Sequence, residues 1–590
     1  MAFNSTSHSP STQHEDSVPP STSRKAGGWR AIAYILGNES FEKLASMSLI
    51  ANLTVYLRTK YNLGGIFLVN VVTIWTGSSN VLSIAGAVVS DAYLGRFLTL
   101  LFGSISSLVG MGTIALTAAI PELRPPACHE PSVCEQPRGW QIVVLLLGLL
   151  LLAIGAGGIR PCNIAFGADQ FDTRTEKGRA RLESFFNWWY FSFTIALMIA
   201  LTGVVYVQTN ISWAIGFAIP TVCLACSIII FLIGRRTYII RKPQGSIFID
   251  MAKVISASIK KRKVNLRQSS DHTFYSPATD EELEPTKLML TDRFNCLNKA
   301  AVILDSSELD CQGQPTDSWR LCSVQQVEQL KCLVGIVPVW CSAIGCFVVM
   351  DQQNTFGNLQ GIQMNQFLGP HFKVPPAWMG NTSMLALSFW IFIYQSLYLP
   401  TSRKIMKRDA RITLKEKIRT GIVMSILCMV MAGIVEKKRR ESALKHGSHV
   451  SPLSIGFLLP QFVLSGLTEA FAAVAIMEFF TVQMPESMRS IAGAVFFLSL
   501  SIGSYLSSLI VNIIHVATGK NGRQPWLGDH DLNKNRLDYY YFIIASLGVI
   551  NFVYFTFFAG NYVSSKKAIT TGGDLQLDNH SISQSRKFSA

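Results

Sequence analysis

Long blocks of apolar residues are the feature that most constrains this chain. A helix needs about 20 predominantly apolar residues to cross the hydrocarbon core of a bilayer. Twelve blocks can be counted, at residues 31–57, 67–90, 97–120, 140–161, 185–208, 212–234, 327–350, 379–400, 420–435, 452–480, 490–515 and 539–562. Only 15% of the 590 residues are charged, against about 25% in a typical soluble domain. We therefore predict an all-α membrane protein with twelve transmembrane helices.

Polar segments divide these blocks into two sets of six. We expect a disordered cytosolic tail, a six-helix bundle, a cytosolic central loop, a second six-helix bundle and a second cytosolic tail, at 1–30, 31–234, 235–326, 327–562 and 563–590. The first tail lacks the apolar run of a signal peptide. Two bundles joined by a long loop predict a substrate site between them, near the bilayer midplane.

Basic residues indicate the orientation of the chain. Residues 235–267 contain ten Lys or Arg against the single acid Asp250, and residues 403–419 are also strongly basic. Because cytosolic loops carry the excess of Lys and Arg, both segments and both termini are predicted to be cytosolic. The cluster at 437–440 disagrees with this orientation. We interpret the net charge of +15 as an orientation signal and an attraction to anionic lipids, and not as nucleic-acid binding.

Charges inside the first apolar block are candidates for function. Glu39, Glu42 and Lys43 fall on one helical face, and a charge at the bilayer centre costs roughly 2.5 to 3.5 kcal/mol. We interpret Glu39 and Glu42 as a pair of carboxylates that bind and release protons. The nearby positive charge of Lys43 lowers the pKa of a carboxylate and so opposes its protonation. The alternative is a salt-bridged helix end at the membrane surface.

Two further charges call for a partner across the bundle. Arg160 follows four small residues in the fourth block, and Glu469 lies in an apolar stretch with no cation nearby in sequence. We expect the two to pair, although Arg160 at a helix end could instead extend its side chain to the surface.

The remaining intramembrane charges and the cysteines are weaker candidates. Lys331 either serves the substrate or forms a local pair with Glu328. Asp351 and Glu478 lie nearer block ends and are expected at the membrane interface. Cys128 and Cys134 share a polar loop, where a disulfide and two free thiols are equally expected.

Motif searches argue against an enzyme. The chain has no G-x-x-x-x-G-K-[ST], G-x-S-x-G or H-E-x-x-H motif, so ATP-driven transport and common hydrolytic reactions lack their markers. No cofactor or metal is expected.

Four segments resemble a known transporter family. GAVVSDAYLGR, from Gly86 to Arg96, resembles the loop after the second helix in the major facilitator superfamily. ESFEK, GAGGIRPCNIAFGADQFD and FFNWWYFSF resemble motifs of the proton-coupled oligopeptide transporter family. More narrowly, WRLCSVQQVEQLKCLVGIVPVW and NKNRLDYYYF resemble the plant nitrate and peptide transporter family, particularly its second subfamily. The likeness extends over about residues 30–562.

This resemblance implies two six-helix bundles that rock around a central cavity. It implies proton coupling at Glu39, Glu42 and Lys43, an Arg160–Glu469 pair between the bundles, and a cytosolic gate built on Asp91, Gly95 and Arg96. Further substrate or gating positions are Lys331, Trp340 and Met350, of which Met350 stands near the place of a histidine associated with nitrate recognition. The tyrosines of F-x-Y-Y-G, which line the peptide site in relatives, are absent after Lys43.

We therefore predict a proton-driven symporter of a small anion or a glycosylated metabolite, such as nitrate, a glucosinolate or another glucoside. The alternatives are a proton-independent uniporter or exporter of nitrate or chloride, and a nutrient sensor. The plasma membrane is the expected location, with the vacuolar membrane as the alternative. Kinases acting on the tails are the expected protein partners.

Overall fold

The computed structural model describes residues 27–564 except for 127–134, 172–175, 241–246, 264–272, 277–287, 289, 312, 370–371, 407–411, 485–488 and 521–523. Most of both predicted tails lies outside this part of the chain. So do Cys128 and Cys134, and their disulfide stays a prediction.

Helices make up most of the described chain. The α-helices are α1 (Gly28–Thr59), α2 (Gly65–Val89), α3 (Arg96–Ala119), α4 (Gly139–Ala168), α5 (Glu176–Ile199), α6 (Trp213–Ile233), α7 (Ile247–Lys260), α9 (Asn295–Asn298), α10 (Val324–Gly335), α11 (Val337–Gln352), α12 (Asn358–Ile362), α13 (Trp378–Ile393), α14 (Leu399–Met406), α15 (Leu414–His446), α16 (Leu459–Thr468), α17 (Val474–Gln483), α18 (Arg489–Thr518), α19 (Leu537–Tyr554) and α20 (Gly560–Ser564). The strands are β1 (Met364–Asn365), β2 (Phe367–Leu368), β3 (Phe372–Lys373) and β4 (Ser451–Ser454). β1 pairs with β4 in parallel, and β2 pairs with β3 antiparallel.

Short π-helical turns interrupt or extend several long helices. The ones that bear on function are η1 (Ser90–Leu94), η8 (Gln353–Gly357) and η11 (Glu469–Ala473). Two more, η3 (Ala200–Val204) and η4 (Val207–Ile211), continue α5. Such turns are rare and are frequently found at functional sites.

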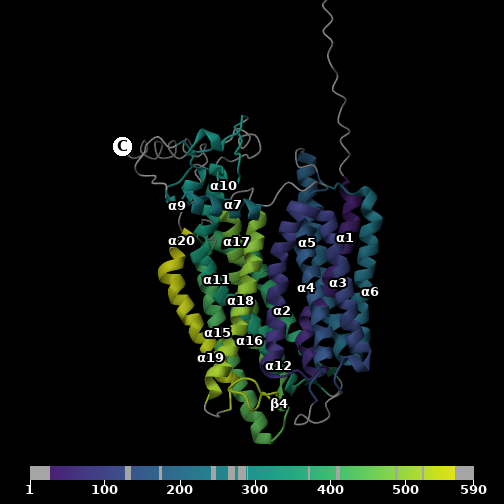
Figure 1. Cartoon of the computed structure of the whole chain (residues 1–590). Helices are drawn as coiled ribbons and strands as arrows, with labels where there is room; N and C mark the ends of the chain where they lie inside the picture. Colours follow the sequence, from purple (N-terminus) through teal and green to yellow (C-terminus); the bar gives the residue numbers. More distant parts are fainter. Residues whose placement is uncertain are drawn as a thin grey trace, which may run out of the picture.

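The described helices account for the predicted spans. Nine are long and apolar enough to cross a membrane, and α10 with α11 and its continuation forms a tenth span bent by 44°. The helices α1 and α5 lie beside them (Figure 1) and correspond to the other two predicted spans. Large apolar side chains such as Leu147, Leu385 and Phe557 stay at least 51% exposed, as expected for a lipid-facing surface. The prediction of an all-α, multi-pass membrane protein is confirmed.

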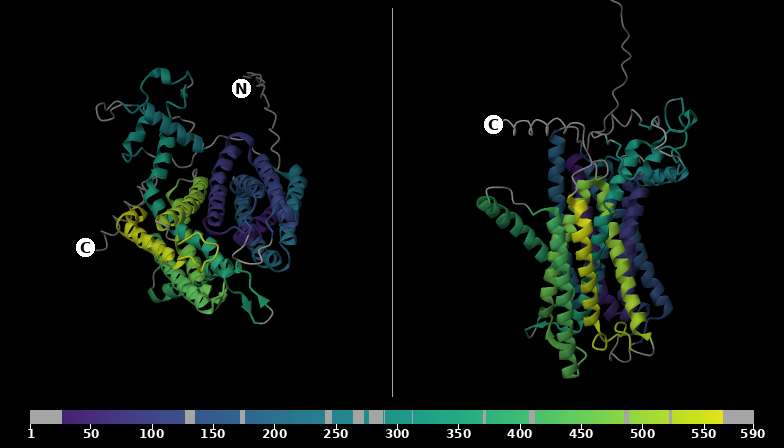
Figure 2. Two further views of the ribbon diagram at one scale, coloured as in Figure 1. Left: turned by 60° about the horizontal axis from the view of Figure 1, so that its bottom comes forward. Right: turned by 90° about the vertical axis from the view of Figure 1, so that its left-hand side faces the viewer.

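The helices run side by side as one elongated body (Figure 1 and Figure 2). In Figure 1, α1–α6 occupy one side, and α11 and α15–α19 occupy the other. We call these the first side and the second side. Helices α2 and α18 lie at the boundary between them. The central-loop elements α7, α9 and α10 lie with α20 at one end, whereas α12 and β4 lie at the other end. We call these the loop end and the β4 end. If the loop end is cytosolic, as the basic residues predict, the β4 end faces outward.

Local sequence explains where key helices begin and bend. Ser323 and Gln326 form a capping box at the start of α10, and Thr413 and Glu416 form one at the start of α15. These pairs satisfy backbone N–H groups that a helix start leaves free. Pro338 stands at the first turn of α11, where its missing N–H is tolerated. The seventh span therefore breaks and bends between α10 and α11.

Small residues bring α2, α3 and α4 close together. A side chain at Gly86 of α2 would meet the carbonyl oxygen of Gly157 on α4, and one at Gly155 would meet Ser107 of α3. The glycines before Arg160 thus allow backbone-to-backbone packing, the arrangement expected of small residues in membrane helices.

The basic cluster that contradicted the orientation is part of a helix. The ninth span was expected at 420–435, but α15 continues to His446. Arg439 lies on this extension, is fully buried and binds Glu436 with nitrogen–oxygen distances of 2.8 Å. Arg440 donates to the backbone carbonyl of Asn533. These two arginines therefore stabilise the β4 end through Glu436 and Asn533. This structural role explains why a positive cluster lies at the end opposite the central loop.

The described part of the central loop forms a layer at its end of the molecule. Lys261 is buried, and its Nζ donates to the Val302 carbonyl at 2.7 Å and to Glu308 at 3.1 Å. Thr291 binds Glu328 of α10 through both its N–H and its hydroxyl. The described part of the loop is thereby anchored to the start of the seventh span.

We predict that alanine at Gly86 and alanine at Gly112 have opposite effects on stability. Gly86→Ala forces α2 away from α4 and should destabilise the protein by about 1–3 kcal/mol. Gly112, within α3, has nothing within 4 Å of its added Cβ, so Gly112→Ala should stabilise by roughly 0.4–1 kcal/mol. Thermal unfolding of the purified proteins measures both, and equal shifts would contradict the close helix approach.

Candidate substrate and proton site

Two carboxylates and a lysine form a buried ion cluster on α1. Lys43 Nζ lies 3.7 Å from Glu39 Oε1 and 3.2 Å from Glu42 Oε2. All three side chains are buried, with Glu39 only 1% exposed. Trp189 of α5 lies beside Glu39. The interpretation of these residues as a helix end at the membrane surface is therefore wrong, because they lie inside the first bundle.

Arg160 joins this cluster from α4. Its guanidinium donates to Asn80 Oδ1 of α2 at 2.7 Å, and it is close enough to interact electrostatically with Glu42 and Lys43. The structure thus brings together two acids and two bases on α1 and α4, with a neutral amide from α2. We call Glu39, Glu42, Lys43, Arg160 and Asn80 the charge cluster.

The expected pair between Arg160 and Glu469 is not formed in this structure. Glu469 opens η11, and among the described residues no cation lies within ion-pair distance of it. Arg160 instead turns toward Asn80 and Glu42. The predicted Arg160–Glu469 pair is therefore wrong for this conformation. The described hydrogen bonds between the two sides of the molecule are made by other residues.

Among the described residues, the hydrogen bonds between the two sides are found in the half of the molecule between the middle of the helices and the β4 end. Near that end, Asn70 of α2 exchanges hydrogen bonds of 2.9 and 3.1 Å with Asn512 of α18. Closer to the middle, Ser501 donates to the Gly77 carbonyl at 2.8 Å. At the end of α1, Thr54 donates to the Asn354 carbonyl. The molecule is therefore held together at the β4 end, away from the central loop.

The gate motif lies at the opposite end of α2 and α3. Gly95 has a φ of 77° at the corner between η1 and α3, a conformation that favours glycine. Arg96 lies 3.8 Å from Asp91 and binds Asp169, at the end of α4, at 2.5 Å. The structure therefore brings Asp91, Gly95 and Arg96 together, with Asp169 as an additional partner.

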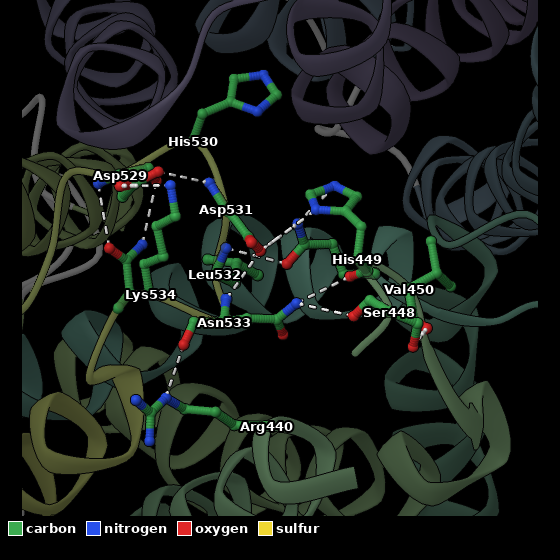
Figure 3. A network of polar contacts seen from close by, with 12 residues as sticks. Arg440, Ser448, His449, Val450, Asp529, His530, Asp531, Leu532, Asn533 and Lys534 are labelled. Atoms are coloured by element: carbon green, nitrogen blue, oxygen red, sulfur yellow. Dashed lines mark hydrogen bonds and ion pairs between the residues drawn. The ribbon is translucent and has the colours of Figure 1, made fainter. Parts of the chain in front are cut away.

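A polar network ties the loop between α18 and α19 to the β4 end (Figure 3). Asp531 Oδ1 accepts hydrogen bonds from the backbone N–H of Asn533 and from Gln363, and lies 3.4 Å from His449 Nδ1. Arg58, near the end of α1, donates to the backbone carbonyl of His530. This loop therefore joins both sides of the molecule.

His530 has an unusual environment within that network. Its two ring nitrogens are buried and have no hydrogen-bond partner among the described residues. Burial lowers the pKa of His530 to about 4, and the positive charges of Arg58 and His449 act in the same direction, against Asp529 and Asp531. The docked imidazole is therefore neutral near pH 7.

The other predicted positions lie outside the charge cluster. Lys331 is 3% exposed and binds Glu328 and the Thr291 carbonyl at the loop end, so the local pair is formed. Trp340 of α11 donates to Ser499 of α18 at 2.5 Å. Met350 is partly buried against the apolar core of the second side. Their assignment to substrate binding or gating stays a prediction.

Comparison with known proteins agrees with this arrangement of motifs. The family model described as PTR2, POT family, matches residues 97–527. The chain belongs to the POT family. This confirms the family that its motifs resemble.

Its relatives narrow the placement within the family. The chain is 59% identical to the Arabidopsis thaliana protein NRT1/PTR FAMILY 2.8 over 92% of its own length and 97% of that protein. It is 45% identical to NRT1/PTR FAMILY 2.13 of the same plant, over 91% and 87%. The second-subfamily resemblance is thereby confirmed for this POT family member.

A solved structure supports the fold. The POT family transporter PepTSo matches with a TM-score of 0.66 at 18% identity, covering 91% of this chain and 99% of that one. At this identity the likeness shows the fold alone.

Several residues of the site were not predicted from the sequence. Asn80, Trp189 and Asp169 contact predicted site residues only because α2, α5 and α4 pack around α1 and α3. Asn80 could have been noticed as an amide within an apolar block. Nothing in the sequence pattern shows that it contacts Arg160.

We predict that acid loosens the loop between α18 and α19. A free histidine gains a proton below pH 6.5 whereas docked His530 does not until about pH 4, so docking is fully stable above 6.5 and weakens as pH falls from 6.5 toward 4. Hydrogen exchange in residues 524–536, corrected for the intrinsic effect of pH, should rise over this range. His530→Gln should flatten that rise, and an unchanged rise in the variant would exclude His530 as its cause.

Proposed function

We propose that this POT family member is a proton-coupled symporter of a small anionic or glycosylated solute. The single observation that carries the proposal is the charge cluster, in which Glu39 and Glu42 lie beside Lys43 and Arg160 within the first bundle. A membrane protein retains such buried charges mainly for transport or proton transfer.

Charge balance in the cluster links protons to an anion. With both glutamates ionised, two negative charges offset two positive charges. Protonation of one glutamate leaves one positive charge in excess, and an anion restores the balance. Burial makes an unbalanced charge costly, so proton and anion binding should favour each other. Nitrate satisfies this requirement with its charge, and a glucosinolate does so with its sulfate.

Alternating access supplies the movement in this proposal. The described polar contacts between the two sides run from mid-helix to the β4 end, so in this proposal the substrate enters or leaves this conformation from the loop end. Release of those contacts and closure around Arg96 would expose the charge cluster to the other side. The proposed driving force is the proton gradient, without a cofactor, and regulation by kinases acting on the tails is a further proposal.

Locking the β4 end should stop transport. In Asn70→Cys/Asn512→Cys, a short cleavable thiol crosslinker should lower uptake at least about tenfold, equivalent to roughly 1.4 kcal/mol in the barrier. Cleavage should restore uptake, and each single variant treated with the same reagent serves as control. Full uptake by the crosslinked protein would contradict release of this contact during transport.

Removing one titrating group should uncouple transport from protons. Glu42→Gln keeps the shape of the side chain but cannot ionise, so acid-stimulated uptake should fall at least about tenfold, a factor equivalent to roughly 1.4 kcal/mol. Uptake and current in expressing oocytes at acidic and neutral pH, with nitrate, chloride, a glucosinolate and a neutral glucoside as probes, measure this effect.

A matched control separates coupling from folding. Glu478→Gln changes an exposed acid that pairs with Lys417 at the loop end, and it should transport as the wild type does at equal surface expression. Wild-type uptake that does not depend on pH would favour the proton-independent uniporter instead.

A further inference from the structure

A pocket lies between the two sides of the molecule near the β4 end. Arg58, at the end of α1, lines it from the first side, and Phe356 and Leu359 line it from the second side. The loop between α18 and α19 supplies much of the remaining wall, including His530. None of the residues that line this pocket belongs to the charge cluster, so the proposed transport mechanism does not use it.

Arg58 brings an incompletely paired positive charge to the pocket. It is only 8% exposed. Its guanidinium donates to the backbone carbonyl of His530, which is its one hydrogen-bond acceptor among the described residues. Asp529 and Asp531 are close enough to interact with it electrostatically, but within the described chain no carboxylate oxygen lies within 4.0 Å of it. A buried guanidinium with unused N–H groups favours a further acceptor.

The imidazole of His530 lies beside that guanidinium. A Cβ atom added at Gly64 would stand 2.7 Å from His530 Cδ2 and 2.9 Å from Arg58 Nη1, so the two groups flank the same spot. Both ring nitrogens of His530 are buried without a hydrogen-bond partner in the described chain. Figure 3 shows the ring turned away from Asp531 and His449. The pocket therefore places a guanidinium beside an imidazole that gains a charge in acid.

The charged groups around His530 balance one another while its ring is neutral. They come from α1, from the segment between α15 and β4, and from the loop itself: Arg58, His449, Asp529, Asp531 and Lys534. On α18, His515 lies beside Gly528 and binds the Leu527 carbonyl. With the histidines neutral, one arginine and one lysine offset two aspartates. A proton on His530 leaves one positive charge in excess.

The two aspartates already have other partners. Asp529 Oδ1 accepts from the backbone N–H of Asp531 at 2.9 Å, and its Oδ2 lies 3.9 Å from Lys534 Nζ. Asp531 Oδ1 accepts from the backbone N–H of Asn533 and from Gln363. An additional anion is therefore better placed than either carboxylate to offset a proton on the ring.

We propose that this pocket binds a small monovalent anion, of the size of chloride or nitrate, together with a proton on His530. The proton adds to one ring nitrogen, and the new N–H and the guanidinium of Arg58 both donate to the anion. Because an unbalanced buried charge is costly, the proton and the anion should each favour binding of the other. A water molecule would accept the same hydrogen bonds but would not offset the charge.

Such an anion would act on the contact between the two sides. Acid weakens docking of the loop because a released His530 gains a proton below pH 6.5, whereas the docked ring does so only at about pH 4. A bound anion lets the docked ring keep a proton at higher pH, so it removes part of this loss. The β4 end should therefore stay closed in acid when the anion is present. The inference goes beyond the proposed function, because it concerns a different site.

Hydrogen exchange in residues 524–536 of the full-length protein tests the site without transport. Between pH 4 and 6.5, chloride should slow this exchange at least about threefold relative to gluconate at equal ionic strength, the effect of a ligand at about twice its Kd. Gluconate carries the same charge on a much larger molecule. At alkaline pH, where His530 is neutral, the two salts should give equal exchange. Equal exchange in acid would overturn the proposal.

Two variants assign the effect to the pocket. His530→Gln cannot gain a proton and should abolish the chloride effect. Arg58→Lys keeps the charge but loses the planar fork of donors, so it should reduce the effect. His446→Gln, at the same end, changes an exposed histidine that binds the Ser442 carbonyl of its own helix, and it should behave as the wild type does. A chloride effect that is undiminished in His530→Gln would be a general salt effect and would overturn the site.

Two further measurements identify the anion and separate this site from the charge cluster. Equal protection by nitrate and chloride would mean that the pocket selects charge and size, whereas protection by nitrate alone would mark it as an entry site for a solute. Glu42→Gln should give the wild-type result in chloride and in gluconate. Failure of proton-coupled uptake and failure of this anion site are therefore distinguishable.

Discussion

The structure depends on one constraint, that the bilayer core offers no water to a backbone amide or a charge. The membrane-spanning helices satisfy their own backbone groups, and the charges within them must be satisfied by one another. Arg439 with Glu436 and Lys331 with Glu328 are complete local pairs. The charge cluster around Arg160 is balanced only when both of its glutamates are ionised. Among the described residues, neither Asp351 nor Glu469 has a lysine or arginine within ion-pair distance, and this separates them from the structural pairs.

The two sides of the molecule contain different kinds of buried polar groups. The first side holds the charge cluster, to which the proposed function assigns proton and anion binding, and the ion pair of Asp91 and Arg96. The second side holds a buried amide network in which Gln461 donates to Gln353 and Gln360 at 3.1 and 3.0 Å. The network ties η8, α12 and α16 together, and Gln461 Oε1 is left without a hydrogen-bond partner among the described residues. This side contacts the first through hydrogen bonds from α18 to α2.

The β4 end combines arginine contacts with a buried histidine. The loop between α18 and α19 is held by Arg439 and Arg440 from α15 through Asn533, and by Arg58 from α1 through His530. The arginine contacts from α15 involve no imidazole, whereas the contact from α1 involves His530, whose pKa burial lowers to about 4. This end faces outward in the predicted orientation. In that orientation, protonation of His530 would act on the contact between Arg58 and this loop from the outer side.

The sequence by itself determined the helices, their approximate limits, the family and the grouping of Glu39, Glu42 and Lys43, because these follow from apolar length and from spacings of three and four residues within one helix. It could not show that Arg160 turns to Asn80 instead of Glu469, that Arg439 is buried, or that Asp351 lies inside the protein. Those facts depend on which helices become neighbours and in which conformation. Only the tertiary structure decided them, because the partner of a buried charge comes from a helix distant in the chain.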